Sequence, residues 1–440
     1  MNKRPYINYM KDDIAIHNCH ILTFDEEWKE FPEGLVLLRD NRISYVGNEA
    51  DNPAYKAERK IDAHGGIVMP PFFNGHTHSA MSILRGLGSE KALKTWLEDY
   101  IWPAEAKFVN EENVFLGSMI SAIEMIKGGT GIFCDMYFFQ EETAKACEEL
   151  GIRMIMGEGV LDFPTPNKKS PEEGLILNEY LCGKYINHPL IELSIPAHAP
   201  YTCSPPVLEE IGELARRFDV PTTTHLAETE WETGEMKKRY GKSSTELLLD
   251  TGFIEGKSVA YHCNYLSVSD IQILHDNKVG IVSNPKSNMK LGSGICPVPE
   301  LMETGLIIGI GSDGAATNNN SDLLSDIQFL PRLHKMNKLD PTIINAKQVL
   351  RMAVNNSAEI YGMDDRIGSI ETGKLADMII INTDQVHWQP LYDPYASIVY
   401  AMQPEDVDTT IINGKVIMED RQIMTADEEE FQEKIKTAVS

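Results

Sequence analysis

The length and charge of the chain set the first limits on its function. It has 440 residues, with 40 Lys and Arg against 66 Asp and Glu, which gives a formal net charge of −26. Such an excess of negative charge repels phosphate backbones and anionic membrane surfaces, so we expect neither nucleic acid nor a membrane as a partner. Because α/β barrels of about 250 residues fold as single units, the length fits one barrel with a smaller appendage.

Cysteine usage and the lack of targeting segments favour a reducing compartment. The seven cysteines are an odd number and include no C-x-x-C pair, which is not the pattern of a disulfide framework. Residues 1–13 lack the apolar core of a signal peptide, and no stretch approaches the roughly 18 apolar residues of a membrane span. We therefore expect a cytoplasmic protein. Its oligomeric state is left open, a homo-oligomer included.

Both ends of the chain have the pattern of short β-strands. From about Ile14 to Val68, apolar runs alternate with turn residues, as in GLVLLRDNRISYVG. The same pattern of short apolar runs occurs near the C-terminus in KLADMIIIN and TTIINGKVIMEDRQI, where Asn413-Gly414 is a typical two-residue hairpin turn. We predict that residues 1–66 and 367–440 together form one small β-sandwich domain, with an acidic C-terminal tail, DEEEFQEKIKTAVS, that looks like an exposed terminal helix.

Between these ends, short apolar runs alternate with longer segments of helical periodicity, such as PPVLEEIGELARRF. That alternation is typical of βα units around a parallel sheet. The predicted fold class is therefore α/β, a (β/α)₈ TIM-type barrel over residues 67–366. The eight apolar runs are 67–74, 131–136, 153–160, 191–199, 221–228, 258–264, 279–285 and 306–314.

Six polar residues fall at or just past the carboxyl ends of these runs, where barrel enzymes keep their active sites. They are His76, His78, His198, His225, His262 and Asp313. A lone histidine is usually a structural residue, but six coincident placements make that interpretation a poor one.

The first histidine pair suggests a metal site. Side chains two apart along a strand share a face, so His76 and His78 can bind one ion together. His225 and Asp313 can complete the set from across the barrel and leave a position open for water. Nitrogen with carboxylate ligands suits Zn²⁺, with Fe²⁺ or Mn²⁺ also compatible. No lysine lies in the fourth run, so a bridged two-metal site has no donor, and we expect one divalent ion per subunit.

Two residues are candidates for proton transfer. Glu228 lies three residues after His225 and is the nearest group that could shuttle a proton, although glutamates are most often surface residues. His262 could orient the attacking water or stabilise charge at the attacked carbon, or it could only support its neighbours.

Several motifs resemble the amidohydrolase superfamily, and more closely its branch of 5′-methylthioadenosine/S-adenosylhomocysteine deaminases and triazine hydrolases. They are PPFFNGHTH (70–78), HLAET (225–229), HC (262–263), SNPKSNMKLGSG (283–294) and GSDGAATNNN (311–320). The resemblance covers nearly the whole chain. It implies zinc on His76, His78, His225 and Asp313, with Glu228, His262 and Asp313 catalytic.

The same resemblance implies where substrate binds. Glu105 and His198 match positions that contact the sugar in nucleoside deaminases, and Glu228 would hold the base as well as move protons. Glu158 stands where some of these enzymes have a substrate-contacting arginine, so we expect it among the substrate-binding residues. A carboxylate on the substrate then has no evident partner, unless Lys168 or Lys169 reaches it.

These observations favour a metal-dependent deaminase that converts an adenine nucleoside, such as 5′-methylthioadenosine, S-adenosylhomocysteine or adenosine, to its inosine-type product and ammonia. One alternative keeps the site but changes the ring or leaving group, to guanine, a pterin or a triazine. Another is a barrel that has lost catalysis and serves only for binding. That hypothesis predicts that one or more metal ligands are missing, and the sequence has all of them.

Overall fold

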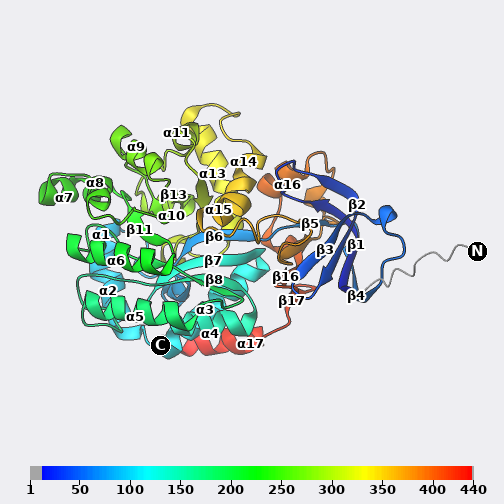
Figure 1. Cartoon of the computed structure of the whole chain (residues 1–440), viewed down its shortest axis with the longest axis horizontal. Helices are drawn as coiled ribbons and strands as arrows, with labels where there is room; N and C mark the ends of the chain where they lie inside the picture. The colour runs from blue at the N-terminus through cyan, green and yellow to red at the C-terminus, as the bar shows by residue number, and fades with distance from the viewer. Residues whose placement is uncertain (1–11, 439–440) are drawn as a thin grey trace, which may run out of the picture.

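A computed structural model describes residues 12–438. Residues 1–11, part of the segment that lacks a signal-peptide pattern, lie outside the described residues. The described chain forms a helix-rich body with a strand-rich body at one side (Figure 1). No helix within residues 12–438 is long and apolar enough to cross a membrane.

The strands of the two chain ends form one sheet. Its order is β18-β17-β16-β15-β5-β1-β2-β3, and β4 pairs with β1. The junction between the two ends is the antiparallel pairing of β5 with β15. The strands are β1 (Asp12–Leu22), β2 (Glu30–Arg39), β3 (Arg42–Asn48), β4 (Ala57–Asp62), β5 (Ile67–Met69), β15 (Met378–Ile381), β16 (Val407–Ile412), β17 (Lys415–Glu419) and β18 (Gln422–Ile423).

Alternating β-branched residues from both ends fill one core of this sheet. Ile16, Val36 and Val68 come from the first end, and Ile380 and Ile411 from the second. Between β16 and β17 the backbone is left-handed at both Asn413 (φ 53°) and Gly414 (φ 75°), the conformation that a tight hairpin turn requires. The predicted association of the two ends and the predicted hairpin are confirmed.

Parallel strands of the middle segment form the barrel. Hydrogen bonding groups them as β6-β7-β8-β9 and β10-β11-β12-β13-β14. Backbone bonds complete the ring at both seams, from His198 to Val160 (3.0 Å) and from Asp313 to His76 (3.0 Å). The strands are β6 (Phe72–Thr77), β7 (Thr130–Tyr137), β8 (Arg153–Glu158), β9 (Ile191–Leu193), β10 (Ile195–Pro196), β11 (Thr222–Leu226), β12 (Ser258–His262), β13 (Gly280–Ser283) and β14 (Ile308–Ile310).

The eight predicted runs correspond to these strands, with β9 and β10 sharing the fourth run. The first run divides: β5 pairs within the end sheet and the chain enters the barrel at β6. Residues 70 and 71 are both proline, which cannot donate to a strand ladder, and the division falls at them. The predicted domain limits at 66/67 and 366/367 stay a prediction.

Helices surround the barrel (Figure 1). They are α1 (Leu93–Trp96), α2 (Trp102–Phe108), α3 (Glu111–Lys127), α4 (Gln140–Leu150), α5 (Pro171–Lys184), α6 (Pro205–Phe218), α7 (Glu230–Tyr240), α8 (Ser244–Asp250), α9 (Val268–Asp276), α10 (Pro285–Leu291), α11 (Val298–Glu303), α12 (Ala315–Asn318), α13 (Leu323–Lys338), α14 (Ala346–Arg351), α15 (Ser357–Ile360), α16 (Pro394–Tyr400) and α17 (Glu428–Ala438). Polar caps start several of them, as where the Ser243 side chain accepts from the Glu246 amide before α8.

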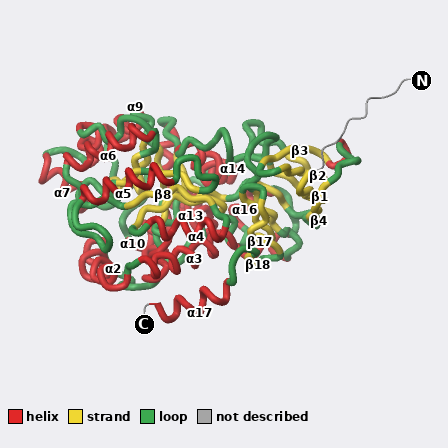
Figure 2. The backbone as a smooth tube through the Cα atoms, turned by 60° about the horizontal axis from the view of Figure 1, so that its bottom comes forward, coloured by secondary structure: helices red, strands yellow, loops and turns green. Residues whose placement is uncertain are grey.

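The C-terminal helix α17 packs on the barrel helix α3, away from the end sheet (Figure 2). Phe431 is buried there with its ring 6.1 Å from that of Phe115, and Lys127 forms an ion pair with Glu428. The acidic tail is thus a helix as its sequence suggests, and one of its residues, Phe431, is buried.

Candidate metal centre and active site

The six polar residues predicted at the strand ends gather at one end of the barrel. His76 lies at the centre: its ring centroid is 4.8 Å from that of His78, 4.9 Å from that of His225 and 5.9 Å from that of His262. The ring of His198 is 5.0 Å from that of His225. Strands far apart in sequence therefore bring these side chains into one cluster.

Strained backbone accompanies two of these residues. His262 (φ 67°) and Asp313 (φ 60°) are both left-handed, a conformation that is costly for residues with a Cβ. Such strain is found where a side chain must be aimed at a functional site. Nearby, a Cβ on Gly311 would lie 2.9 Å from the His76 amide nitrogen, so only glycine permits this approach of the strands.

Ligand atoms of the cluster lie close enough to hold one ion. His76, His78 and His225 form one group with ligand atoms within 4.8 Å of one another, and His76, His262 and Asp313 form a second. The Asp313 Oδ1 atom lies 3.3 Å from His78 Nε2, which joins the two groups. The residues predicted as ligands are therefore together, and His262 lies at the same centre.

Hydrogen bonding leaves the metal-facing nitrogens available. His78 Nδ1 is 2.5 Å from the Met136 carbonyl and His225 Nδ1 is 2.5 Å from the His198 carbonyl, so each ring donates from Nδ1 and keeps Nε2 free. His76 is fully buried, and neither of its ring nitrogens has a hydrogen-bond partner. Buried polar atoms are rarely left unpaired, so this orphaned ring fits a site for a cation.

The surroundings of the cluster favour the protonation states that bind a metal ion. Burial, with the neighbouring histidines, lowers the pKa of His76 and of His225 well below the usual value, so both are neutral near pH 7. Burial acts to raise the pKa of Asp313, but His78 and His262 outweigh it and lower that pKa. Neutral imidazoles and an ionised carboxylate are what a divalent ion requires.

Two adjacent side chains at the start of α10 fix two members of the cluster. Ser287 Oγ donates to Asp313 Oδ2 at 2.6 Å, and Thr317 Oγ1 donates to the same oxygen at 2.9 Å. Asn288 Oδ1 is 2.8 Å from His262 Nδ1 and accepts from it. Asp313 Oδ1 therefore stays on the side of His76 and His78, and His262 is fixed in one ring orientation.

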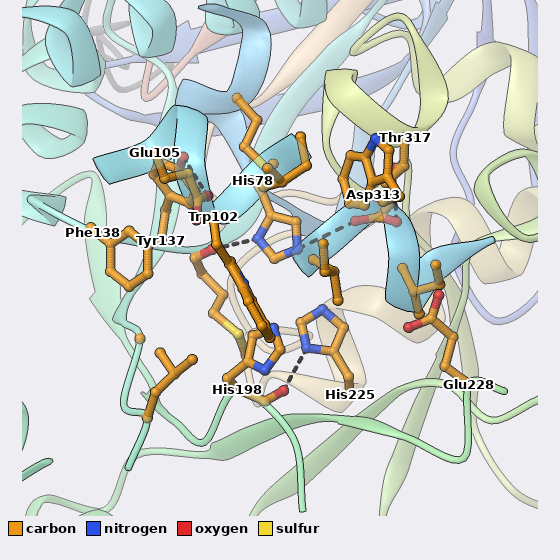
Figure 3. Close-up of a pocket in the computed structure, with 18 of the residues that line it drawn as sticks. His78, Trp102, Glu105, Tyr137, Phe138, His198, His225, Glu228, Asp313 and Thr317 are labelled. Carbon is orange, nitrogen blue, oxygen red and sulfur yellow. Dashed lines mark hydrogen bonds and ion pairs between the residues drawn. The ribbon is translucent and has the colours of Figure 1, made fainter. Parts of the chain in front are cut away.

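Glu228 lies beside the cluster with its carboxylate exposed to the cavity (Figure 3). Its Oε1 atom is 3.9 Å from His262 Nδ1. Burial raises the pKa of Glu228 to about 7, where a carboxyl group can both accept and release a proton at neutral pH. Burial acts to lower the pKa of His262, but the carboxylates of Glu228 and Asp313 outweigh it and raise that pKa.

A cavity of about 730 Å³, its open mouth included, extends from this cluster. On the far side from Glu228 it contains Glu105, which accepts a hydrogen bond from Tyr137 Oη at 2.8 Å (Figure 3). Burial raises the pKa of Glu105 to about 7. His198 also lines the cavity, and its Nδ1 is 2.9 Å from Thr202 Oγ1. Both predicted sugar-contacting residues thus face the space where a small molecule would lie.

Glu158 is placed differently from the prediction. It is buried but is not among the residues that line the cavity. Its Oε1 accepts from Lys168 Nζ at 2.6 Å and from Asn167 at 3.0 Å, while its Oε2 accepts from the Gln140 amide at 2.9 Å. Its carboxylate is therefore bound to protein groups, because β8 ends by turning this side chain toward the following loop.

Sequence reasoning missed the residues that form the apolar wall of the cavity. They come from the segment 93–108 and from the ends of β7 and β8: Trp96, Leu97, Ile101, Trp102, Phe138 and Leu161. The segment is one helical stretch interrupted by a π-helical turn at Leu97–Ile101. The following Pro103 lacks an amide donor, which favours such an irregular turn, and π-turns are frequent at functional sites.

The family model described as amidohydrolase family matches residues 67–417. A protein named 5-methylthioadenosine/S-adenosylhomocysteine deaminase 1 from Syntrophus aciditrophicus is 39% identical over 425 residues, which cover 96% of each chain. A 5′-deoxyadenosine deaminase from Methanosarcina acetivorans is 40% identical over 97% of each. Among solved structures, an adenosine deaminase from Xanthomonas campestris with bound zinc superposes with a TM-score of 0.95 at 30% identity, over 97% of this chain and 98% of that one.

Proposed function

The chain belongs to the amidohydrolase family, and we propose that it is a metal-dependent deaminase of adenine nucleosides such as 5′-methylthioadenosine, S-adenosylhomocysteine or adenosine. One observation carries this proposal: the candidate metal ligands, the titratable Glu228 and a cavity that Glu105 and His198 also line meet at one end of the barrel. Relatives named as adenosine-type deaminases match nearly the whole chain, which supports the substrate class.

We assign one divalent ion to His76, His78, His225 and Asp313. Three nitrogens and one carboxylate oxygen suit zinc, which the similar adenosine deaminase from Xanthomonas campestris binds. When bound, such an ion supplies Lewis acidity that lowers the pKa of water toward neutrality. The orphaned ring nitrogens of His76 are the structural observation that fits this assignment.

The side chains of the protein would then move two protons. Glu228 accepts a proton from the water that attacks C6 of the adenine ring and delivers it to a ring nitrogen. Asp313 passes the second proton to the departing amine, and His262, fixed by Asn288, orients the water. Water and the aminated ring are consumed, and the inosine-type nucleoside and ammonia are formed.

A substrate panel tests the reaction. The metal-loaded protein is incubated with adenine nucleosides, guanine, a pterin and a chlorotriazine, and the release of ammonia and of chloride is measured. We expect ammonia from the adenine nucleosides. Reaction with guanine or the triazine alone would overturn the substrate class but keep the family chemistry. Absence of both metal and turnover after purification without chelator would indicate a non-catalytic barrel.

We expect Asn288→Ala to lower kcat by roughly ten- to hundredfold, the usual cost of removing a group that orients a catalytic or metal-bound histidine. The His262 ring loses the acceptor that fixes its Nδ1 proton. Asn288→Asp keeps an acceptor and should recover much of the loss. Steady-state kinetics with metal analysis check this, and equal rates for the alanine and wild-type proteins would remove Asn288 from any positioning role.

Nucleosides should react faster than free adenine, because Glu105 and His198 offer hydrogen bonds to sugar hydroxyls that the base alone leaves unpaired. Glu105→Leu should lower kcat/KM for nucleosides by about tenfold or more, the value of a hydrogen bond to a charged group. The value for adenine should barely change, because adenine makes no such bond. An equal loss for base and nucleoside would place Glu105 outside sugar recognition.

A further inference from the structure

The described lining of the cavity offers no lysine or arginine to a negatively charged substrate tail. Among its described lining residues are three carboxylates, Glu105, Glu228 and Asp313, and no lysine or arginine. The part of the wall away from the metal cluster is formed by apolar side chains of segment 93–108, Leu93 included, and of the β7 and β8 ends. A group without charge therefore finds contact here, whereas a carboxylate finds nothing to neutralise it.

One candidate cation beside the cavity, Lys168, is already paired with a carboxylate. Lys168 Nζ donates to Glu158 Oε1 at 2.6 Å and to the Gly159 carbonyl at 2.7 Å, and it lies 5.4 Å from the centroid of the Phe138 ring. An ammonium group has three donors, and two of them are used by these two oxygen acceptors. The side chains of the pair are only 4% and 0% exposed. Phe138 lines the cavity, whereas neither member of the pair does.

A longer tail would enter a second, outer cavity that shares Leu93, Leu97, Trp102 and Tyr201 with the first. Its described lining contains one cation, Lys94, against two carboxylates, Glu98 and Glu230.

Lys94 is itself engaged, because its Nζ lies 3.9 Å from Glu98 and 5.0 Å from the centroid of the Trp231 ring. The described lining of the outer cavity therefore also has more carboxylates than lysines, and its one lysine already lies beside a carboxylate.

On the basis of the proposed function, we propose that the site selects adenine nucleosides whose 5′ substituent is small and uncharged, and discriminates against those that carry a carboxylate. The metal cluster and Glu228 take the reacting end of the base, and Glu105 and His198 take the sugar hydroxyls. The apolar wall then contacts the face of the adenine ring and the 5′ group. A methylthio or methyl group gains contact there, whereas a carboxylate loses its hydration without a partner.

The test is kcat/KM for 5′-methylthioadenosine, 5′-deoxyadenosine, adenosine and S-adenosylhomocysteine with zinc-loaded enzyme under one condition. We expect 5′-methylthioadenosine to exceed S-adenosylhomocysteine by at least about a hundredfold. The tail of S-adenosylhomocysteine is a zwitterion, and its carboxylate finds no lysine or arginine in the described lining of the inner cavity even where its ammonium group meets a carboxylate. 5′-Methylthioadenosine should exceed adenosine by about tenfold, from one apolar group in an apolar pocket. A ratio to S-adenosylhomocysteine of less than about tenfold would overturn the selectivity.

An uncharged analogue of similar length, 5′-butylthio-5′-deoxyadenosine, separates charge from size. We expect it to react nearly as well as 5′-methylthioadenosine, and a rate as low as that of S-adenosylhomocysteine would overturn the charge argument. Either result would overturn the selectivity while adenine nucleosides are still deaminated. If no adenine nucleoside reacts, the proposed function itself fails and the selectivity falls with it.

Two variants test whether Lys94 or Lys168 binds the carboxylate of S-adenosylhomocysteine. Lys94→Met removes the half-exposed outer cation, and the double variant Glu158→Gln with Lys168→Met replaces the buried pair by neutral groups of similar shape. We expect both to leave the ratio of the two substrates unchanged. A selective further loss of S-adenosylhomocysteine turnover in either would show that its lysine binds the carboxylate. If the double variant does not fold, the Lys94 variant and the wild-type substrate panel still test whether the site discriminates against a carboxylate.

Discussion

Replacing Glu228 by glutamine should lower kcat by more than about a hundredfold, the lower end of what general acid and base groups contribute. The amide keeps the shape of the side chain but cannot accept the proton of the attacking water. Metal content should not change, because Glu228 belongs to neither group of ligand atoms. Single-turnover kinetics together with metal analysis measure both quantities, and a variant with most of its activity would exclude Glu228 from the mechanism.

Two controls distinguish proton transfer from a general loss of charge. Glu230→Gln removes a carboxylate from the same turn at an exposed position in the outer cavity, and it should leave kcat near the wild-type value. The pH profile gives the second control. Since burial raises the pKa of Glu228 to about 7 and the base form must be ionised, kcat/KM should fall as the pH falls through about 7. The glutamine variant should lose this acidic limb.

The sequence predicts the barrel and its metal cluster because both depend on local order. A run of apolar residues defines a parallel strand, and the residue just past its carboxyl end must lie at the catalytic face. His76 and His225 lie within the last two residues of β6 and β11, and Asp313 follows β14, so their meeting required only that the strands close into a ring. The association of the two chain ends was predictable for a similar reason, since each has unpaired short strands that need partners.

The walls of the cavity could not be predicted in the same way. Trp96, Trp102 and Phe138 are apolar residues in helical or loop segments, and in sequence such residues are indistinguishable from core residues. Which of them face a cavity depends on how the segment 93–108 crosses the barrel mouth. Its π-helical turn changes which side chains face inward. The turn precedes Pro103, which has no amide to donate, and periodicity alone does not indicate where such a turn forms.

Side-chain pairing explains the different placement of Glu158. Its position in the sequence matches a substrate-contacting position of related deaminases, but the loop that follows β8 supplies Lys168 and Asn167 to its carboxylate. Two charges that pair in a buried site satisfy one another, so neither is available to a ligand. Ser287 and Asn288 show the opposite case: they lie within a motif visible in the sequence, and only the structure indicates that they position Asp313 and His262.

Replacing His225 by alanine should remove the bound metal and the activity together. The proposed site has four protein ligands, and a site of this kind needs at least three to hold its ion with one position open for water. The Nδ1 atom of His225 is fixed by the His198 carbonyl, so its Nε2 atom is already oriented toward the ion. Binding of the ion therefore loses little side-chain entropy at His225. Metal analysis of protein purified without chelator, with activity before and after added zinc, measures both losses.

His198→Ala is the matched control for this prediction. The His198 ring is 5.0 Å from that of His225, but it belongs to neither group of ligand atoms, and the carbonyl that fixes His225 is a main-chain group that the substitution keeps. The control should therefore retain its metal and lose affinity for the nucleoside, seen as a higher KM. Full metal occupancy in the His225 variant would mean that the ligands are wrongly assigned. Since His262 is the other histidine whose ligand atom lies with those of His76 and Asp313 in the described chain, it would then be the residue to replace next.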